Sequence, residues 1–287
     1  MSGNNLKTVA LLAFLTALVV LMAELFGFGF IWGLIIAGAL NFAFYFWSAR
    51  LALGASRARP VEEHELPGVY AIVRRLTLMD EMPMPSIYLI DSPQPNAFAT
   101  GRSPKHAAVA VTSGIVDMLS TQELEGVLAH ELAHVRNRDI LISTIAAMLA
   151  AALTIFARIA FWTGGGRGRQ GNAITAILAL ASLILAPIAA MIIRLAISRA
   201  REYEADHDGA EMTGQPLNLA SALEKIGMAT QRIPMAVNPA VSPLYIADPL
   251  KSVQGRRRAG GFSRLFATHP PIEERIDRLQ EMATGVR

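Results

Sequence analysis

Two histidines four residues apart, with a glutamate directly after the first, are the residues of this sequence best suited to catalysis. His130, Glu131 and His134 occur in "LAHELAHVRNRD" (128–139). On a helix, residues four apart project from one face, so both imidazoles can reach one Zn²⁺ at about 2.0–2.1 Å. Glu131 then flanks the ion, where a base can take a proton from water. The spacing predicts a hydrolytic zinc centre, although two surface histidines on a polar helix would have the same spacing.

The neighbours of these histidines favour a metal. The surrounding "GVLAHELAHV" (126–135) is mostly apolar, so the histidine face is expected to be buried, and an unpaired buried imidazole is costly. The chain has no cysteine. This excludes a thiolate zinc site, a disulfide framework and a cysteine nucleophile, so any metal must be bound by His, Asp or Glu.

A catalytic zinc needs a third protein ligand and one open position. If "AISRAREYEADHDGAEM" (196–212) is helical, Glu202 and Asp206 share one face, a turn apart. Glu202 can then supply the carboxylate, and Asp206 can orient a histidine. The alternative is a solvated charged face in which Glu202, Glu204 and Asp206 balance Arg199 and Arg201. The remaining histidines have no evident ligand spacing to the first pair: His64, His106, His207 and His269.

The composition is that of a membrane protein. Of the 287 residues, 53% are hydrophobic and 17% are charged, against about 25% charged in a soluble domain. Four apolar runs, each near the ~20 residues that a spanning helix needs, lie at 8–26, 31–53, 140–162 and 173–193. They predict four transmembrane helices in two hairpins. A signal peptide is the alternative for the first run, and buried helices of a soluble domain are the alternative for the second hairpin.

The positive charges predict the orientation. Lys and Arg gather before runs one and three and after runs two and four, at Lys7, Arg50, Arg57, Arg59, Arg136, Arg138, Arg194, Arg199 and Arg201. Arg167 and Arg169 in the opposing loop weaken this asymmetry without reversing it. The positive-inside rule then places both termini and the polar segments in the cytoplasm. The net charge of +3 is small, so we expect no nucleic-acid partner.

The polar segments predict one cytoplasmic domain of mainly α (α+β) class, interrupted by the second hairpin. The expected division is a first hairpin at 1–53, domain parts at 54–139 and 194–287, and a second hairpin at 140–193. Helices are predicted at 68–82, at 121 to about 138 after a capping box of Ser120 and Glu123, at 216–230 and at 270–282. Strands are predicted at 86–91 and 106–112, with a short edge strand between them at 96–101. Spans three and four are antiparallel neighbours, so they would bring Glu202 to the histidines just above the membrane surface.

Several of these stretches together resemble one family. "HELAH", "SRAREYEADHDGA", "PNAFATGRSPKHAAVAVTSGI" and "THPPIEERIDRL" occur in that order between apolar hairpins, as in the HtpX family of bacterial membrane proteases, which is related to the eukaryotic CAAX prenyl protease. The resemblance implies a zincin-like protease domain with one zinc per chain. It further implies ligands at His130, His134 and Glu202, a catalytic base at Glu131 and an aspartate behind the ligands at Asp206.

The same resemblance implies where substrate lies. Asn96, Ala97, Phe98 and Ala99 match an edge strand along which an extended peptide can pair. His269 matches a histidine thought to approach the scissile carbonyl, and its alternative is a residue at the start of a helix. The expected substrates are proteins and peptides, including membrane proteins or misfolded ones, cut at the cytoplasmic face of the bacterial inner membrane in quality control. The lipid bilayer is the other expected partner.

Two other functions are compatible with parts of this pattern. An intramembrane protease would carry the histidine motif inside a span, but "STQELEG" and "RNRD" beside it are polar, and a charge at mid-bilayer costs about 2.5–3.5 kcal/mol on insertion scales. A non-enzymatic scaffold or a transporter would need no metal. The spans hold few acidic residues for an ion pathway, and a metal measurement separates this case from the enzyme.

Overall fold

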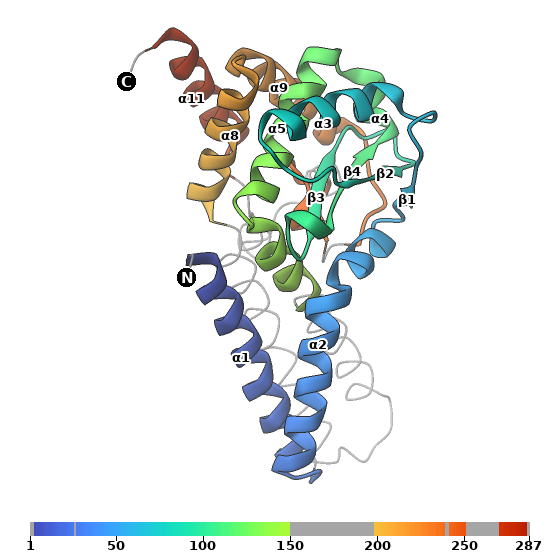
Figure 1. The fold of residues 1–287 in the computed structure, drawn as a ribbon, viewed down its shortest axis with the longest axis vertical. Helices are drawn as coiled ribbons and strands as arrows, with labels where there is room; N and C mark the ends of the chain where they lie inside the picture. The colour runs from blue at the N-terminus through green and yellow to red at the C-terminus, as the bar shows by residue number, and fades with distance from the viewer. Residues whose placement is uncertain (1–2, 26, 150–197, 239–240, 251–269, 286–287) are drawn as a thin grey trace, which may run out of the picture.

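The computed structural model describes residues 3–25, 27–149, 198–238, 241–250 and 270–285 (Figure 1). Two long helices are followed by a domain that contains a small sheet and several helices. The helices are α1 (Gly3–Leu25), α2 (Phe30–Ala55), α3 (Pro67–Met79), α4 (Ser113–Met118), α5 (Thr121–Arg136), α8 (Arg199–Thr213), α9 (Pro216–Arg232) and α11 (Ile272–Thr284). The strands are β1 (Arg59–Pro60), β2 (Ser86–Ile90), β3 (Ala97–Gly101) and β4 (Ala107–Thr112), and short 3₁₀ turns lie at η1 (Pro104–His106) and η2 (Ser242–Leu244).

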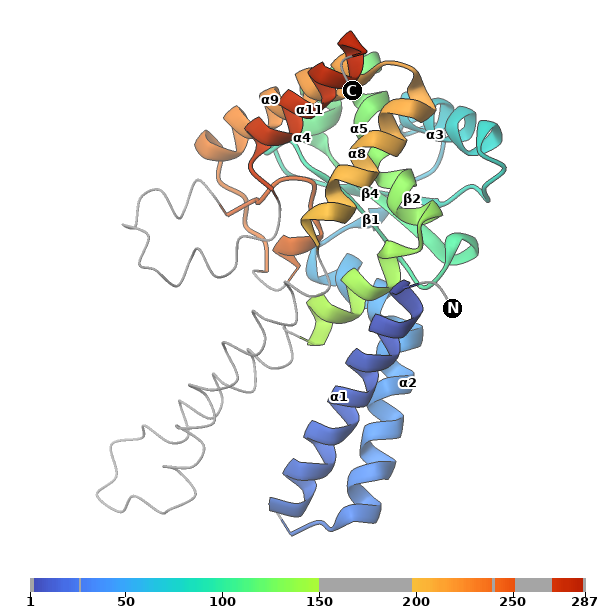
Figure 2. The ribbon, with the colours of Figure 1, turned by 90° about the vertical axis from the view of Figure 1, so that its left-hand side faces the viewer.

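Helices α1 and α2 form a hairpin that extends away from the domain (Figures 1 and 2). They approach closely at Gly33, where an added Cβ would lie 3.0 Å from Ala23 Cβ. Asn41 Nδ2 donates to Thr16 Oγ1 across the interface at 2.8 Å. Within the described residues, Phe30–Ala55 is long and apolar enough to cross a membrane, and Thr8–Leu21 is a shorter apolar stretch of α1. The first two predicted spans are thus helical.

The other two predicted spans fall largely on residues 150–197, outside the described residues. The start of the third is seen as an apolar helix at Asp139–Leu149. A turn separates this helix from α5, because Asn137 caps α5 and Arg138 has a positive φ of 59°. The total of four membrane spans therefore remains a prediction, and so do the domain boundaries that depend on it.

The sheet has the strand order β1-β2-β4-β3. Strands β2 and β4 are parallel, while β3 runs antiparallel to β4, with Ala97 opposite Val111 and Gly101 opposite Ala107. The segment at 96–101 is thus an edge strand, as predicted, and it pairs with the outer side of β4. The chain crosses from β2 to the far side of β4, so one edge of β3 has no partner strand in the described part of the sheet.

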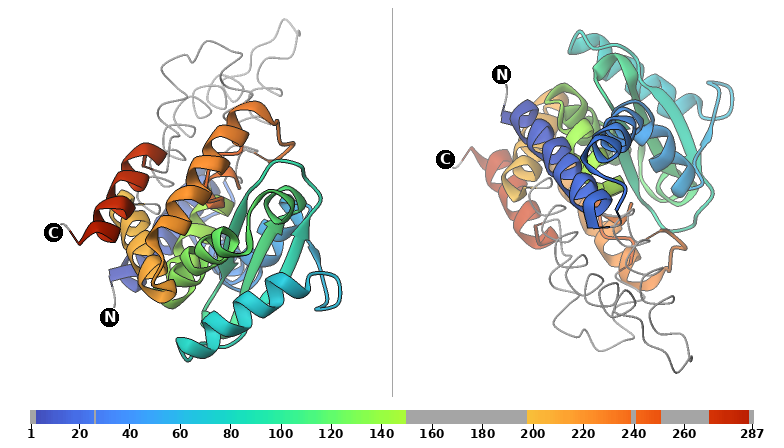
Figure 3. Two further views of the ribbon diagram at one scale, coloured as in Figure 1. Left: turned by 90° about the horizontal axis from the view of Figure 1, so that it is seen from above. Right: turned by 90° about the horizontal axis from the view of Figure 1, so that it is seen from below.

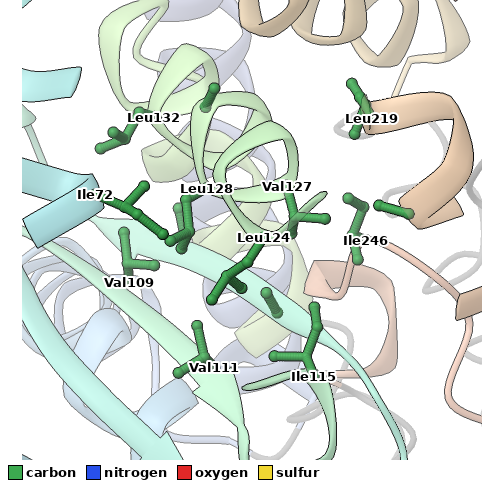
Figure 4. Packing of buried hydrophobic residues seen from close by; sticks show 14 of the residues in the cluster. Ile72, Val109, Val111, Ile115, Leu124, Val127, Leu128, Leu132, Leu219 and Ile246 are labelled. Carbon is green, nitrogen blue, oxygen red and sulfur yellow. The ribbon is translucent and has the colours of Figure 1, made fainter. Parts of the chain in front are cut away.

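Both faces of the sheet are covered, which explains why β3 and β4 are buried along their whole length. One face carries Ala97, Ala99, Val109 and Val111 and packs against α3 and α5 (Figure 4). The other face carries Phe98, Ala108 and Ala110. It packs against Ala52 and Leu53 near the end of α2 and against the helix at Asp139–Leu149. The α1–α2 hairpin is therefore continuous with the core of the domain.

Helix α5 is the centre of the domain. It contacts β3, α3, α8 and α9, and every residue from Gly126 to Ala133 is buried. Its start is fixed by the predicted capping box: Glu123 N donates to Ser120 Oγ at 3.3 Å, and Ser120 N donates to Glu123 Oε2 at 2.9 Å. The apolar residues of α5 pack into the core (Figure 4), and on the same helix His130 is buried and His134 is partly buried.

Helices α8, α9 and α11 cover the side of α5 away from the sheet (Figures 2 and 3). Helix α8 begins at Arg199 because Ser198 is extended, with φ −90° and ψ 135°. The segment with Glu202 is therefore a helix, as predicted, within the described residues. Helix α8 approaches α5 most closely at Gly209, where an added Cβ would lie 2.8 Å from the backbone N of His130. Only glycine allows this approach.

Candidate metal centre

The two motif histidines lie side by side on the buried part of α5. Their ring centroids are 4.8 Å apart and the rings are nearly perpendicular, at 86°. His130 is 1% exposed. The side chain of His134 is 16% exposed, so neither histidine is a free surface residue, and imidazoles this far from solvent need specific partners.

Glu202 of α8 supplies the third candidate ligand. The ligand atoms of His130, His134 and Glu202 all lie within 4.8 Å of one another, and His134 Nε2 is 3.5 Å from Glu202 Oε1. Four-coordinate zinc with bonds of about 2.0–2.2 Å sets its ligand atoms roughly 3.4 Å apart. The donor set of two imidazoles and one carboxylate, buried at one end of a cavity, therefore fits a zinc ion. Glu204, by contrast, is exposed, so the solvated-face alternative applies to it and not to Glu202 or Asp206.

A carboxylate lies behind each histidine. His130 Nδ1 is 3.0 Å from Asp206 Oδ1, and His134 Nδ1 is 3.1 Å from Asp139 Oδ2. When each Nδ1–H donates to its carboxylate, each Nε2 keeps its lone pair for a metal. Burial lowers the pKa of His134, but the hydrogen bond to Asp139 and the charge of Glu202 outweigh burial and raise that pKa to about 9.

Arg275 of α11 contacts Asp206 and lies close to Glu202. It is fully buried and donates to both oxygens of Asp206, from Nε to Oδ2 at 2.7 Å and from Nη2 to Oδ1 at 2.6 Å. Its Nη1 donates to Ile246 O at 3.1 Å and lies 3.9 Å from Glu202 Oε2. Burial raises the pKa of Asp206, but the charge and hydrogen bonds of Arg275 outweigh burial and lower it. Arg275 thus keeps Asp206 ionised behind His130.

Arg275 and Asp139 were not among the site residues predicted from the sequence. A signal for Arg275 was present, because it lies three residues after Ile272 and four before Leu279, on the apolar stripe of an otherwise polar helix. A charged residue at such a position requires a buried partner. Asp139 had no comparable signal, since it follows His134 by five residues and lies past the end of α5.

Glu131 lies beside the ligand set and contacts the edge strand. Its Oε2 accepts a hydrogen bond from Ala99 N at 2.8 Å. The side chain is buried, and burial raises the pKa of Glu131, although the neighbouring charges of His130 and His134 oppose that rise. A carboxyl group in this environment can both accept and release a proton, which general acid–base chemistry requires.

The cavity at the site is lined partly by polar groups and partly by apolar residues. It is lined by the three candidate ligands, Glu131, Asp139, Ala99, Ile140, Ser143, Pro243, Leu244 and Ile246. The segment with Ile246 runs beside β3, and Ile246 N donates to Ala97 O at 2.9 Å. Of the four residues expected to contact substrate, Ala99 lines this cavity. Asn96 is hydrogen-bonded to Ala247, and Phe98 packs against Tyr245 on the far face of the sheet.

The other histidines do not join the site in the described structure. His64, His106 and His207 are exposed. His269 lies outside the described residues, so a catalytic part for it remains a prediction.

Comparison with known proteins extends the resemblance over the whole chain. A protease HtpX homolog of Pelotomaculum thermopropionicum is 49% identical over 286 residues, which cover 98% of this chain and 99% of the relative. A second protease HtpX homolog, from Thermodesulfovibrio yellowstonii, is 49% identical over 285 residues, with the same coverage. These relatives match along nearly their full length.

A solved structure shares the fold. The crystal structure of S. mikatae Ste24p matches with a TM-score of 0.53 at 20% identity, covering 92% of this chain. This chain spans 62% of the Ste24p chain. Residues 63–283, which include His130, Glu131, His134 and Glu202, match the description of peptidase family M48. The chain belongs to peptidase family M48 and is a membrane metalloprotease.

Proposed function

We propose that this chain is a zinc endopeptidase in which His130, His134 and Glu202 bind the ion and Glu131 is the catalytic base. The observation that carries the proposal is the convergence of three ligand atoms within 4.8 Å from α5 and α8, two segments that are far apart in the sequence. Two imidazoles and one carboxylate form a typical catalytic zinc ligand set. When bound, zinc supplies Lewis acidity, which makes water more acidic and polarises the carbonyl of the scissile bond.

The residues of the chain supply the remaining steps. Glu131 accepts the proton of the attacking water and returns it to the departing amine. Before a peptide pairs along β3, Ala99 N–H holds the Glu131 carboxylate by its hydrogen bond of 2.8 Å. Asp206 and Asp139 keep Nδ1 of the two histidines protonated, so that each Nε2 would be free to bind the ion. Arg275 holds Asp206 in place through two hydrogen bonds.

The substrates in this proposal are extended segments of membrane proteins or misfolded proteins. Strand β3 is an edge strand, and its Ala99 lies in the cavity, so a peptide can pair along this edge and reach Glu131. In the state described, Ala97 O and Ala99 N are already hydrogen-bonded to Ile246 and Glu131. Substrate pairing at those atoms would therefore displace these contacts. The protein is multi-pass, with its site and both termini at the cytoplasmic face of the inner membrane, and it acts in quality control.

The test compares wild type with Glu131→Gln in cleavage of a membrane-protein substrate, with zinc content measured on both. We expect Glu131→Gln to keep its zinc and to lose cleavage by about 10²–10⁴-fold, the typical contribution of a general base. Glu204→Gln is the matched control, because Glu204 is an exposed glutamate on α8 outside the site. Cleavage by Glu131→Gln at the wild-type rate would exclude Glu131 as the base.

A further inference from the structure

The loop that joins β3 to β4 contacts the membrane hairpin. In this loop, which we define as residues 102–106, Arg102 Cζ lies 5.2 Å from the centroid of the Phe46 ring on α2. That distance is typical of a cation–π contact. Lys105 and His106, at the other end of the loop, are exposed. The loop therefore lies at the level of Phe46, more than two turns before α2 ends at Ala55.

The aromatic residues of α2 indicate where the membrane surface lies. Phe30 and Trp32 are exposed at one end of the helix, and Tyr45 and Trp47 are exposed towards the other. Aromatic side chains, Trp and Tyr above all, gather at both surfaces of a bilayer. The stretch from 30 to 47 is about 27 Å long at ~1.5 Å per residue, which matches a hydrocarbon core of roughly 30 Å. The membrane surface nearest the domain then falls close to Phe46, earlier than the end at 53 that the sequence suggested.

The charged side chains of α2 and of the β3–β4 loop are all positive. Arg50 follows Phe46 by one helical turn and is exposed, as is Lys105. The sequence has no acidic residue from 25 to 61, and none from 92 to 116. Neither α2 nor the β3–β4 loop therefore contains a carboxylate that could pair with these cations. A charge is costly in hydrocarbon and favourable beside anionic headgroups.

We propose that Arg102 and Lys105 of the β3–β4 loop, together with Arg50 of α2, form a docking surface for the headgroups of anionic phospholipids. The loop continues directly from β3, and Arg102 is three residues after Ala99, or about 10 Å along an extended chain. Headgroup binding at the loop fixes the height and tilt of the edge strand above the bilayer. The lipid contact does not depend on the proposed peptidase activity, so the two can fail separately.

The test uses the absence of cysteine in the chain. The full-length Ser103→Cys protein, labelled with a fluorophore, is placed in lipid nanodiscs of phosphatidylcholine with or without phosphatidylglycerol. Quenching by lipids that carry a nitroxide on the headgroup reports the distance of the loop from the surface. A label at Gln280→Cys is the reference, because Gln280 is exposed on α11, at the end of the domain away from the hairpin (Figure 1).

We expect strong quenching at position 103, a further increase with phosphatidylglycerol, and neither effect at position 280. Arg102→Gln/Lys105→Gln should abolish the increase, while Arg102→Lys keeps it and shows that the fold is intact. Arg74→Gln/Arg278→Gln, which removes two exposed cations on α3 and α11, should leave the increase unchanged.

Three results would each overturn the proposal. The first is equal quenching at positions 103 and 280. The second is quenching at 103 that does not respond to phosphatidylglycerol, or that responds equally in Arg102→Gln/Lys105→Gln. The third is loss of the response on adding inorganic phosphate at constant ionic strength, which would assign the site to a free anion.

Discussion

At the scale of single residues, each candidate histidine ligand is held by its own carboxylate. Asp206 faces His130 and Asp139 faces His134, both at Nδ1 and at about the same separation of 3.0 and 3.1 Å. Partners of this kind fix the tautomer and the orientation of a metal ligand, and their removal typically lowers metal affinity 10–100-fold. Each carboxylate accepts a hydrogen bond from a different arginine. Arg275 Nη2 donates to Asp206 at 2.6 Å, and Arg201 Nη1 donates to Asp139 at 3.4 Å.

Asp139→Asn tests this arrangement without changing a ligand. The amide has the same shape as the carboxylate but no charge, so we expect zinc affinity to fall about 10–100-fold, with cleavage falling in parallel at limiting zinc. Competition with a chelator measures the affinity. Asp208→Asn is the control, because Asp208 binds Arg136 and Asn137 and contacts neither histidine. Equal zinc affinity in Asp139→Asn and wild type would show that Asp139 does not support the ligand.

The residues that sequence analysis identified are those whose spacing follows the helical repeat. His130 and His134 lie one turn apart, and so do Glu202 and Asp206, so a helix alone places each pair on one face. Asp139 was not predicted, because it lies past the end of α5. The positive φ of Arg138 turns the chain there, so that Asp139 lies beside His134. Tertiary structure, and not local spacing, makes that contact.

At the scale of elements, the site depends on how closely α8 approaches α5. Gly209 lies against the backbone of His130, where an added Cβ would be 2.8 Å from its N and 3.0 Å from its Cα. Backbone atoms in a buried helix cannot yield as the end of a flexible side chain can. Glu202 and Asp206 are on the same helix as Gly209, so a shift of α8 moves both relative to the histidines.

Gly209→Ala should therefore weaken metal binding although no ligand is changed. We expect α8 to move outward, zinc affinity to fall at least tenfold and the protein to lose about 1–3 kcal/mol of stability from overpacking. Zinc titration and thermal unfolding in detergent measure the two effects. Gly68→Ala on α3 is the control, since an added Cβ there meets nothing within 4 Å. Unchanged zinc affinity in Gly209→Ala would mean that the approach of the two helices does not set the site.

The start of α5 gives a prediction that depends on pH. Burial raises the pKa of Glu123, but hydrogen bonds from Lys225, Ser221 and Ser120 outweigh burial and lower it from 4.5 to about 2. The folded state therefore favours the carboxylate, and the stability it contributes is present above pH 4.5 and is lost as pH falls towards 2. We expect Glu123→Gln to cost about 2 kcal/mol at neutral pH, a figure reduced because Lys225 is partly exposed to solvent.

Unfolding of wild type and Glu123→Gln in detergent at a series of pH values measures this contribution. The difference in stability between the two proteins should shrink as pH falls below about 4.5. Glu224→Gln on α9 is the control, an exposed glutamate whose removal should leave the pH dependence unchanged. A difference that is constant across the pH range would exclude Glu123 as its source.

Most elements followed from local patterns, and those that did not were specified by the tertiary structure. The stripe of Val69, Ile72, Val73 and Leu76 predicted α3, and all four residues are buried in it. The expected helix from 121 ends at Arg136, because Asn137 caps it before the chain turns. Strand β1 has only two residues, too few to give a pattern. The position of β3 outside β4 depends on strand order, which alternation within a strand does not specify.

At the scale of the whole molecule, α2 links the membrane to the protease domain. Its exposed apolar part forms the hairpin with α1, and its end packs through Ala52 and Leu53 against the face of the sheet opposite α5 (Figure 1). The edge strand therefore has a set position relative to the hairpin, because the same helix is part of both. This linkage explains how the candidate metal centre comes to lie beside the apolar hairpin.

The central claim is that α5 and α8 together form one zinc site. His134 and Glu202, which they contribute to it, are 68 residues apart in the sequence. The most direct test is the zinc content per chain of purified wild type, Glu202→Ala and Glu131→Gln. The account predicts about one zinc in wild type and in Glu131→Gln, and little or none in Glu202→Ala. Full zinc occupancy in a folded Glu202→Ala protein would contradict it.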